Sequence, residues 1–225
     1  MVSTEVYKEQ YMSAETIASD CQNLLDDIES HLFERPYNFD LTQSALLILD
    51  MQDFFLAESS HAHVPSAQAI IPNLRALIKC FASAARPVVF TRHLNNDTDA
   101  GMMRTFWRDL LKRDNPLSAI TDQLDTSSGL ILEKSQYDAF LNSDLQQILS
   151  EQNVRQLVIG GVMTHLCCES TARGAFMRNF EPFMLLDGSA TYNRKFHQSS
   201  LINLSHGFAH IVSSSEIIQK SRGSL

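Results

Sequence analysis

Two adjacent cysteines, Cys167 and Cys168, follow Gly161 closely, where an apolar run gives way to a polar, helix-like segment. A cysteine at a helix N-terminus feels the positive end of the helix dipole, which lowers its pKa and favours the thiolate. Backbone N–H groups at such a terminus can also hold the oxyanion that forms when a thiolate attacks a carbonyl. Because consecutive helical residues point about 100° apart, we expect one cysteine to face a cleft and the other to pack as a small apolar side chain.

A thiol nucleophile needs a base that takes its proton and later returns it to the leaving group. Asp50 and Lys134 each end a short apolar run of the kind that forms a buried parallel strand. Ligands bind at the carboxyl ends of such strands, so we expect these two side chains to meet Cys167 there. Burial is expected to raise the proton affinity of Asp50, while Lys134 stabilises both the carboxylate and the thiolate.

Histidine is the alternative base. His165 stands two residues before Cys167, which on a helix places it on the opposite side. Three further histidines follow in the sequence, at His197, His206 and His210. A Cys–His pair therefore stays open as a less favoured alternative to Asp50.

Cysteine and histidine spacing gives no sign of a disulfide framework or a zinc site. The four cysteines, which include Cys21 and Cys80, lack paired CxxC spacing, so free thiols are expected. His61 and His63 could form part of a metal site, but no third ligand stands at a suitable spacing. An exposed loop is the preferred interpretation of this pair, and no metal or other cofactor is predicted.

The bulk composition describes one α/β domain that binds a small molecule. A chain of 225 residues is long enough for one large core and short for two. The formal charge of -8 argues against nucleic acid or an anionic membrane as the main partner. The sequence shows no apolar stretch of membrane-spanning length and no signal-peptide pattern at its start, so a cytoplasmic location is expected.

Apolar runs and amphipathic patterns alternate along the chain. The runs predict strands near residues 45–50, 86–93, 129–134, 155–161, 182–188 and, more weakly, 208–213. Helical patterns separate most of them, including one from Ile70 to Phe81, one from Leu141 to Leu149, and a helix expected at Met103–Arg113. The alternation predicts a three-layer α/β/α Rossmann-like sandwich with a mainly parallel sheet of about six strands.

The first 40 residues read as an N-terminal extension to a domain at residues 41–225. Apolar residues recur at helical spacing between Ser13 and Phe33, with acidic residues between them. This amphipathic helix is expected to cover its own domain, or else to contact another subunit. A homo-oligomer, either a dimer or a tetramer, is the expected assembly.

Four motifs in order resemble the isochorismatase-like cysteine hydrolase superfamily. They are "ALLILDMQDFF" from Ala45, "VVFTRH" from Val88, "EKSQYDAF" from Glu133 and "GVMTHLCCESTARGAF" from Gly161. The resemblance spans about residues 45–208 and implies a Rossmann-like α/β/α fold. It also implies a catalytic triad of Asp50, Lys134 and Cys167.

The resemblance assigns further features around the nucleophile. It implies a cis peptide bond between Val162 and Met163, and an oxyanion hole formed by the backbone N–H groups of Met163 and Cys167. Cys168 stands where relatives commonly have valine, so it is expected to pack rather than react. Gly174 stands where many relatives have aspartate, which would alter a helix contact without touching the triad.

The departures from the superfamily patterns favour C–N bond hydrolysis. Nicotinamidases place a metal-binding Asp and two His after the second strand, and "TRHLNNDTDAGMMRTFW" shows no such set, so a nicotinamidase is disfavoured. True isochorismatases typically have glycine in place of Cys167, because they cleave a vinyl ether by protonation. Retention of Cys167 favours a thioacyl-enzyme route on an amide, carbamoyl or ureido substrate.

Two alternatives remain open, an isochorismatase-type hydrolase and a non-catalytic ligand-binding protein. The substrate pocket in any of these cases is expected at the strand-end loops, where aromatic and cationic groups orient a ligand. The residues predicted for its wall are His93, Arg104, Trp107 and Tyr137.

Overall fold

The computed structural model describes residues 6–107 and 109–222. They form a six-stranded, all-parallel sheet in the order β3-β2-β1-β4-β5-β6. The strands are β1 (Ser44–Leu49), β2 (Val88–His93), β3 (Leu130–Lys134), β4 (Gln156–Val162), β5 (Glu181–Ala190) and β6 (His210–Val212). Each predicted apolar run forms a strand, so the predicted fold class is confirmed.

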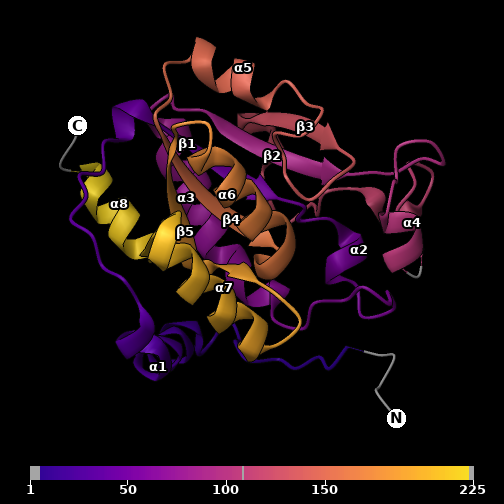
Figure 1. The fold of residues 1–225 in the computed structure, drawn as a ribbon, viewed down its shortest axis with the longest axis horizontal. Coiled ribbons are helices and arrows are strands. Elements are labelled where there is room, and N and C mark those ends of the chain that lie inside the picture. Colours follow the sequence, from indigo (N-terminus) through magenta and orange to yellow (C-terminus); the bar gives the residue numbers. More distant parts are fainter. Residues whose placement is uncertain (1–5, 108, 223–225) are drawn as a thin grey trace.

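Helices cover both faces of the sheet (Figure 1). On one face α3 (Ile71–Ser83) packs with α8 (Ser214–Arg222), and on the other α6 (Glu169–Phe176) packs with α7 (Arg194–Gly207). The shorter helices are α2 (Asp53–Leu56), α4 (Met103–Phe106) and α5 (Leu145–Glu151). β1, with all six residues buried, lies between β2 and β4 at the centre of the core.

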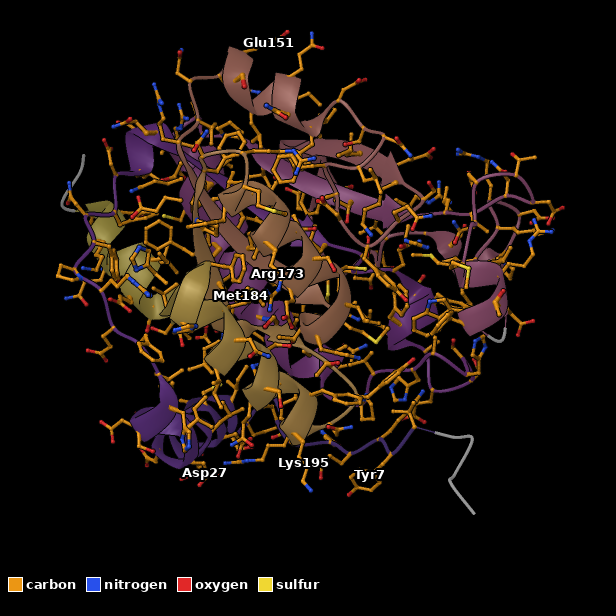
Figure 2. The ribbon with its side chains drawn as sticks, viewed as in Figure 1. Tyr7, Asp27, Glu151, Arg173, Met184 and Lys195 are labelled. Atoms are coloured by element: carbon orange, nitrogen blue, oxygen red, sulfur yellow. The ribbon has the colours of Figure 1, made fainter. Side chains whose placement is uncertain are left out.

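Side-chain burial follows this layering. Met184 of β5 is fully buried within the sheet, whereas Asp27, Glu151 and Lys195 point outward at the surface (Figure 2). Within the described part of the chain, no helix is both long and apolar enough to cross a membrane.

The N-terminal helix packs on its own domain. α1 (Ile17–Ile28), with a 3₁₀ turn after it at Glu29–His31, lies against α7 and β5. The apolar stripe predicted for this helix is buried at Cys21, Leu24 and Ile28. The helix is shorter than the predicted Ser13–Phe33 span, because residues 14–16 form a turn before it and the 3₁₀ turn ends it.

Two predicted helices differ from the structure. The helix expected at Met103–Arg113 ends at Phe106, because the backbone of Trp107 turns extended (φ -99°, ψ 146°) and the following residues enter the pocket wall described below. The helix expected from Leu141 starts at Leu145, and Leu141 itself is exposed. Arg108, inside the first of these spans, lies outside the described residues.

Candidate active site

Asp50 stands directly after β1, at the point where the strand order reverses. In sheets of this type, ligands bind at that switch point. Its backbone has φ of 52°, a left-handed conformation that Asp tolerates better than most residues. Thr91 of β2 fixes the side chain, because its hydroxyl donates to Asp50 Oδ1 at 2.6 Å and accepts from the Asp50 backbone N–H at 3.1 Å.

Lys134 ends β3 and joins the other two members of the predicted triad. Its Nζ lies 2.7 Å from Asp50 Oδ2 and 3.4 Å from Cys167 Sγ. A third bond runs from Nζ to the carbonyl of Gln136 at 2.9 Å. Both charged side chains of the ion pair are 0% exposed, so neither charge reaches the solvent.

Cys167 lies in a π-helical turn, Thr164–Cys168, that connects β4 to α6. Its side chain lines the pocket, whereas Cys168, fully buried, is not among the described lining residues. The structure therefore separates the two cysteines as expected. A π turn inside a helical region is often found at functional sites.

The protonation states differ from those expected. Burial raises the pKa of the Cys167 thiol, the Asp50 charge raises it further, and Lys134 offsets these effects only in part. Burial acts to raise the pKa of Asp50 as well, but the Lys134 charge and the hydrogen bonds from Cys167 and Lys134 outweigh it and hold that pKa below its usual value. The predictions of a resting thiolate and of a carboxyl with raised proton affinity are therefore wrong. At rest the site pairs a carboxylate with an ammonium beside a neutral thiol.

His93, predicted for the pocket wall, lies next to the triad. Its Nδ1 is 3.4 Å from Lys134 Nζ and its Nε2 is 2.8 Å from Asn95 Oδ1. The amide of Asn95 donates to the Ser135 carbonyl, which orients Oδ1 as an acceptor. Burial, together with the charge of Lys134, lowers the pKa of His93 to about 4. His93 is therefore neutral, with its proton on Nε2.

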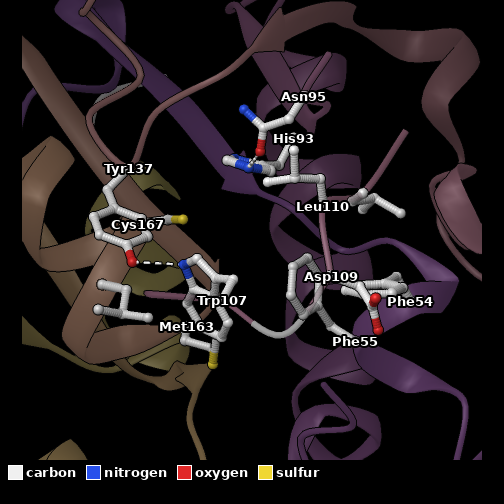
Figure 3. A pocket seen from close by; sticks show the side chains of 12 residues that line it. Phe54, Phe55, His93, Asn95, Trp107, Asp109, Leu110, Tyr137, Met163 and Cys167 are labelled. Atoms are coloured by element: carbon white, nitrogen blue, oxygen red, sulfur yellow. Dashed lines mark hydrogen bonds between the residues drawn. The ribbon is translucent and has the colours of Figure 1, made fainter. Parts of the chain in front are cut away.

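A small pocket, with a volume of about 40 Å³, opens beside the Cys167 sulfur (Figure 3). Trp107 and Tyr137 form one wall, joined by a 2.8 Å hydrogen bond from Trp107 Nε1 to the phenol oxygen. The full lining is Phe54, Phe55, His93, Asn95, Trp107, Asp109, Leu110, Leu111, Tyr137, Met163, Leu166 and Cys167. Three of the four predicted wall residues are thus in place.

Arg104 is the exception among the four. Its side chain is exposed on α4, where the guanidinium donates to the carbonyl of Asp97, and it is not one of the described pocket residues. Sequence reasoning missed Phe54 and Phe55, although they are the last two residues of the first motif. It also missed Asp109, Leu110 and Leu111, because that segment had been predicted as helix.

The rival histidine bases lie elsewhere. His165 Nδ1 contacts the Thr191 hydroxyl at 2.5 Å, and His197 Nδ1 contacts the Tyr11 hydroxyl at 2.8 Å. His210 Nε2 lies 3.0 Å from a Glu181 carboxylate oxygen, and the His206 ring packs on Phe33. None of these four lines the described pocket, so none of them is placed to act as the base for Cys167.

The donor chemistry of the site does not suit a metal ion. Among the described residues, Asp50, His93 and Cys167 are the one group of three donor side chains close enough to share a metal. The Lys134 ammonium already contacts all three of them, so a cation there would face a buried positive charge. His61 and His63 are half-buried rather than exposed, and their carbonyls accept hydrogen bonds from Lys8 Nζ.

Two features implied near the nucleophile are present. The peptide bond between Val162 and Met163 is cis. Gly174 of α6 leaves room for Asp138, whose carboxylate oxygen would lie 2.6 Å from a Cβ at that position. An aspartate at position 174 would place two carboxylates in contact, which explains the departure from the common pattern.

Comparison with known proteins decides the family. Residues 44–216 match the model of the isochorismatase domain family. The chain belongs to the isochorismatase family. The matched residues include every strand of the sheet and all three members of the triad, whereas residues 6–43 precede the match.

The relatives of this isochorismatase-family protein have diverse names. Nicotinamidase 3 of Arabidopsis thaliana is 36% identical over 174 residues, which cover 75% of this chain and 84% of the relative. Enterobactin synthase component B of Escherichia coli (strain K12) is 32% identical over 183 residues, covering 80% of this chain and 64% of the relative. A crystal structure of a cysteine hydrolase from Pseudomonas syringae pv. phaseolicola 1448A shares the fold with a TM-score of 0.80, at 24% identity over 86% of this chain and 98% of that one.

Proposed function

We propose that this isochorismatase-family hydrolase cleaves a C–N bond of a small amide, carbamoyl or ureido substrate through a thioacyl-enzyme intermediate. The observation that carries the proposal is the position of Lys134 Nζ, 2.7 Å from Asp50 Oδ2 and 3.4 Å from the pocket-facing sulfur of Cys167. This arrangement supplies a nucleophile, a base and a compensating charge at one point.

The first half-reaction forms the acyl enzyme. Asp50 takes the proton of the Cys167 thiol as the sulfur attacks the substrate carbonyl, and the carbonyl electrons move to its oxygen. The backbone N–H groups of Met163 and Cys167 are proposed to bind that oxyanion. When the tetrahedral intermediate collapses, the C–N bond breaks and Asp50 gives its proton to the departing nitrogen.

The second half-reaction releases the acid. Asp50 takes a proton from water as the water oxygen attacks the thioester carbonyl. Collapse breaks the C–S bond, and Asp50 returns the proton to the sulfur. The products are ammonia or an amine together with a carboxylic acid from an amide, or a carbamic acid from a carbamoyl or ureido substrate, and the enzyme regains its starting protonation state.

The electrostatics of the site require proton transfer to be coupled to carbon–sulfur bond formation. Because the thiol pKa is raised and the Asp50 pKa is lowered, a free thiolate is an unfavourable species before substrate binds. Bond formation to the carbonyl moves the negative charge from sulfur to the oxyanion. Lys134 stays protonated throughout, since its neighbours raise its pKa although burial acts to lower it.

The pocket favours a compact, flat substrate. Its volume is small and aromatic rings of Phe54, Phe55, Trp107 and Tyr137 line it. Aromatic and apolar walls with a few polar groups are typical of small-molecule binding sites. The name of the Arabidopsis relative places nicotinamide among the amides to test, although the predicted metal-binding set of a nicotinamidase is missing from this sequence.

An isochorismatase-type vinyl ether hydrolysis is the second candidate, favoured by the family itself. That reaction needs Asp50 as a proton donor. The lowered pKa of Asp50 and its ion pair with Lys134 leave it without a proton at neutral pH, which favours the amide reaction.

The deciding experiment is a substrate screen joined to peptide mass mapping. Nicotinamide, small aliphatic amides, ureido acids and isochorismate are incubated with the wild-type protein, with Cys167→Ala and with the matched control Cys168→Val. We expect an acyl adduct on the peptide that carries Cys167, present in the wild type and the control. Isochorismate turnover that survives Cys167→Ala would establish the second candidate instead.

A further inference from the structure

The segment before α1 is hydrogen-bonded to two separate parts of the domain, although it precedes the residues that match the family. We call residues 6–12 the N-terminal strap; it runs below α7 toward α1 (Figure 1). On one side the backbone N–H groups of Tyr11 and Met12 donate to the hydroxyl of Ser66. On the other side the N–H of Glu9 donates to the carbonyl of Tyr192 at 2.9 Å.

The side chain of Tyr11, in the strap, contacts buried groups of the domain. Its hydroxyl accepts a hydrogen bond from the backbone N–H of Thr191 at 3.0 Å. The hydroxyl proton is therefore free to be donated to His197 Nδ1, which lies 2.8 Å away. Burial lowers the pKa of His197 to about 3, so its ring is neutral and Nδ1 can accept that proton.

His197 also contacts the turn that contains the nucleophile. Its Nδ1 also lies 3.3 Å from the hydroxyl of Thr164, the first residue of the π turn Thr164–Cys168. The Thr164 hydroxyl can donate its single proton either to this nitrogen or to the Ser189 hydroxyl of β5 at 3.2 Å, because the Ser189 hydroxyl in turn donates to the Leu185 carbonyl. His197, Thr164 and Ser189 are all 0% exposed, so water cannot replace these bonds without a local opening.

We propose that Tyr11 is a positioning residue for the nucleophile, acting through His197 and Thr164 on the turn that carries Cys167. The N-terminal strap then helps to position the nucleophile of this hydrolase, and it is not a separate extension. This inference rests on the proposed function for its kinetic consequence, but the mechanical link from Tyr11 to the turn stands independently of any substrate. A catalytic role for Tyr11 is not implied, since it does not line the described pocket.

The test compares Tyr11→Phe with Tyr7→Phe. Tyr11→Phe removes one oxygen and leaves the Thr191 N–H and His197 Nδ1 without that partner. Tyr7, on the same strap, is exposed at the surface (Figure 2), and its hydroxyl donates to Glu9. For Tyr11→Phe we expect kcat to fall about ten-fold with KM within about two-fold, because a small displacement of the attacking sulfur costs rate rather than binding. Tyr7→Phe is expected to match the wild type.

Hydrogen–deuterium exchange separates positioning from general destabilisation. In Tyr11→Phe, amide exchange should rise in residues 164–168 and 191–197, while the β2–β3 half of the sheet keeps its wild-type rates. Exchange that rises equally throughout the protein, or a turn with unchanged exchange and unchanged kcat, would overturn the proposal. A Cys167 adduct in the substrate screen together with an unaffected Tyr11→Phe enzyme would remove this inference and leave the proposed function standing.

A second pair of variants covers the case in which Tyr11→Phe does not fold. Asn in place of His197 puts a polar atom near the position of Nδ1, whereas Leu, of similar size, does not. We expect His197→Asn to retain several-fold more kcat than His197→Leu. Equal kcat values in the two folded variants would contradict the proposed path.

Discussion

The Lys134 ammonium lies 2.7 Å from Asp50 Oδ2, in a site where neither side chain reaches solvent. Removing one member of a buried ion pair leaves the other as an uncompensated charge, at a cost of about 3–5 kcal/mol. We therefore expect Lys134→Met to lower the free energy of unfolding by about that amount. Asp50→Asn combined with Lys134→Met should recover most of the loss. Urea unfolding of the single and double variants measures both values, and a double variant as unstable as the single one would contradict this account.

The same ion pair sets the pH dependence of stability. The folded-state pKa of Asp50 lies below its ordinary value of 3.8, so its contribution is present above that pH and is lost as the pH falls through the folded value. The pKa of Lys134 lies above 10.5, so its contribution is present below pH 10.5 and is lost as the pH rises through the folded value. We expect a plateau between these limits in urea unfolding series. The Asp50→Asn/Lys134→Met variant should lack both of these flanks, and identical curves for the two proteins would refute the assignment.

The thiol of Cys167 should behave as a neutral group. Because burial and Asp50 raise its pKa above the ordinary 9.0, iodoacetamide labelling of Cys167 should keep accelerating up to at least pH 9. Fragment-ion sequencing of the labelled peptide distinguishes Cys167 from the adjacent Cys168, and half-exposed Cys80, on another peptide, serves as an internal control. A labelling rate of Cys167 that already reaches its plateau near pH 6 would show a resting thiolate and contradict this assignment.

His93 should stay neutral across the physiological range. Its pKa, lowered to about 4 by burial and by Lys134, predicts no titration between pH 5 and pH 8. Its contacts with Asn95 and Lys134 predict the Nε2–H tautomer. ¹⁵N-NMR of the imidazole tests both, with half-buried His63 as a comparison within the same chain. An Nδ1–H signal from His93 would contradict the hydrogen-bond network.

Gly161 lies where no side chain fits. Its φ is +107°, and a Cβ there would lie 2.1 Å from the carbonyl oxygen of Leu49, the residue before Asp50. We expect Gly161→Ala to destabilise the fold by about 3 kcal/mol or more, since the clash is with backbone on the central strand. Gly207→Ala is the matched control, because nothing lies within 4 Å of its Cβ position. Thermal melts of the two variants give the comparison, and similar melting temperatures would be against this interpretation.

The sequence by itself determined the strands and the three residues of the triad. Short apolar runs that end in Asp50, His93 or Lys134 and alternate with helical patterns predict a parallel sheet, and parallel strands bring their carboxyl ends to one edge. That reasoning needs no knowledge of distances. For this reason the sheet, the meeting of Asp50, Lys134 and Cys167, and most of the pocket wall could be predicted.

The tertiary structure decided the protonation states of the site residues and the contacts that hold these residues in place. Whether Asp50 has a raised or a lowered pKa depends on the 2.7 Å contact with Lys134, which outweighs burial, and no spacing along the chain gives that distance. Residues 109–111 entered the pocket wall because the chain leaves the helix at Trp107, against a helical pattern. The path from Tyr11 to His197 joins positions far apart in sequence through two buried hydrogen-bonding atoms. Such contacts arise from packing in three dimensions, because local propensity and periodicity specify elements but not which side chains from distant elements meet.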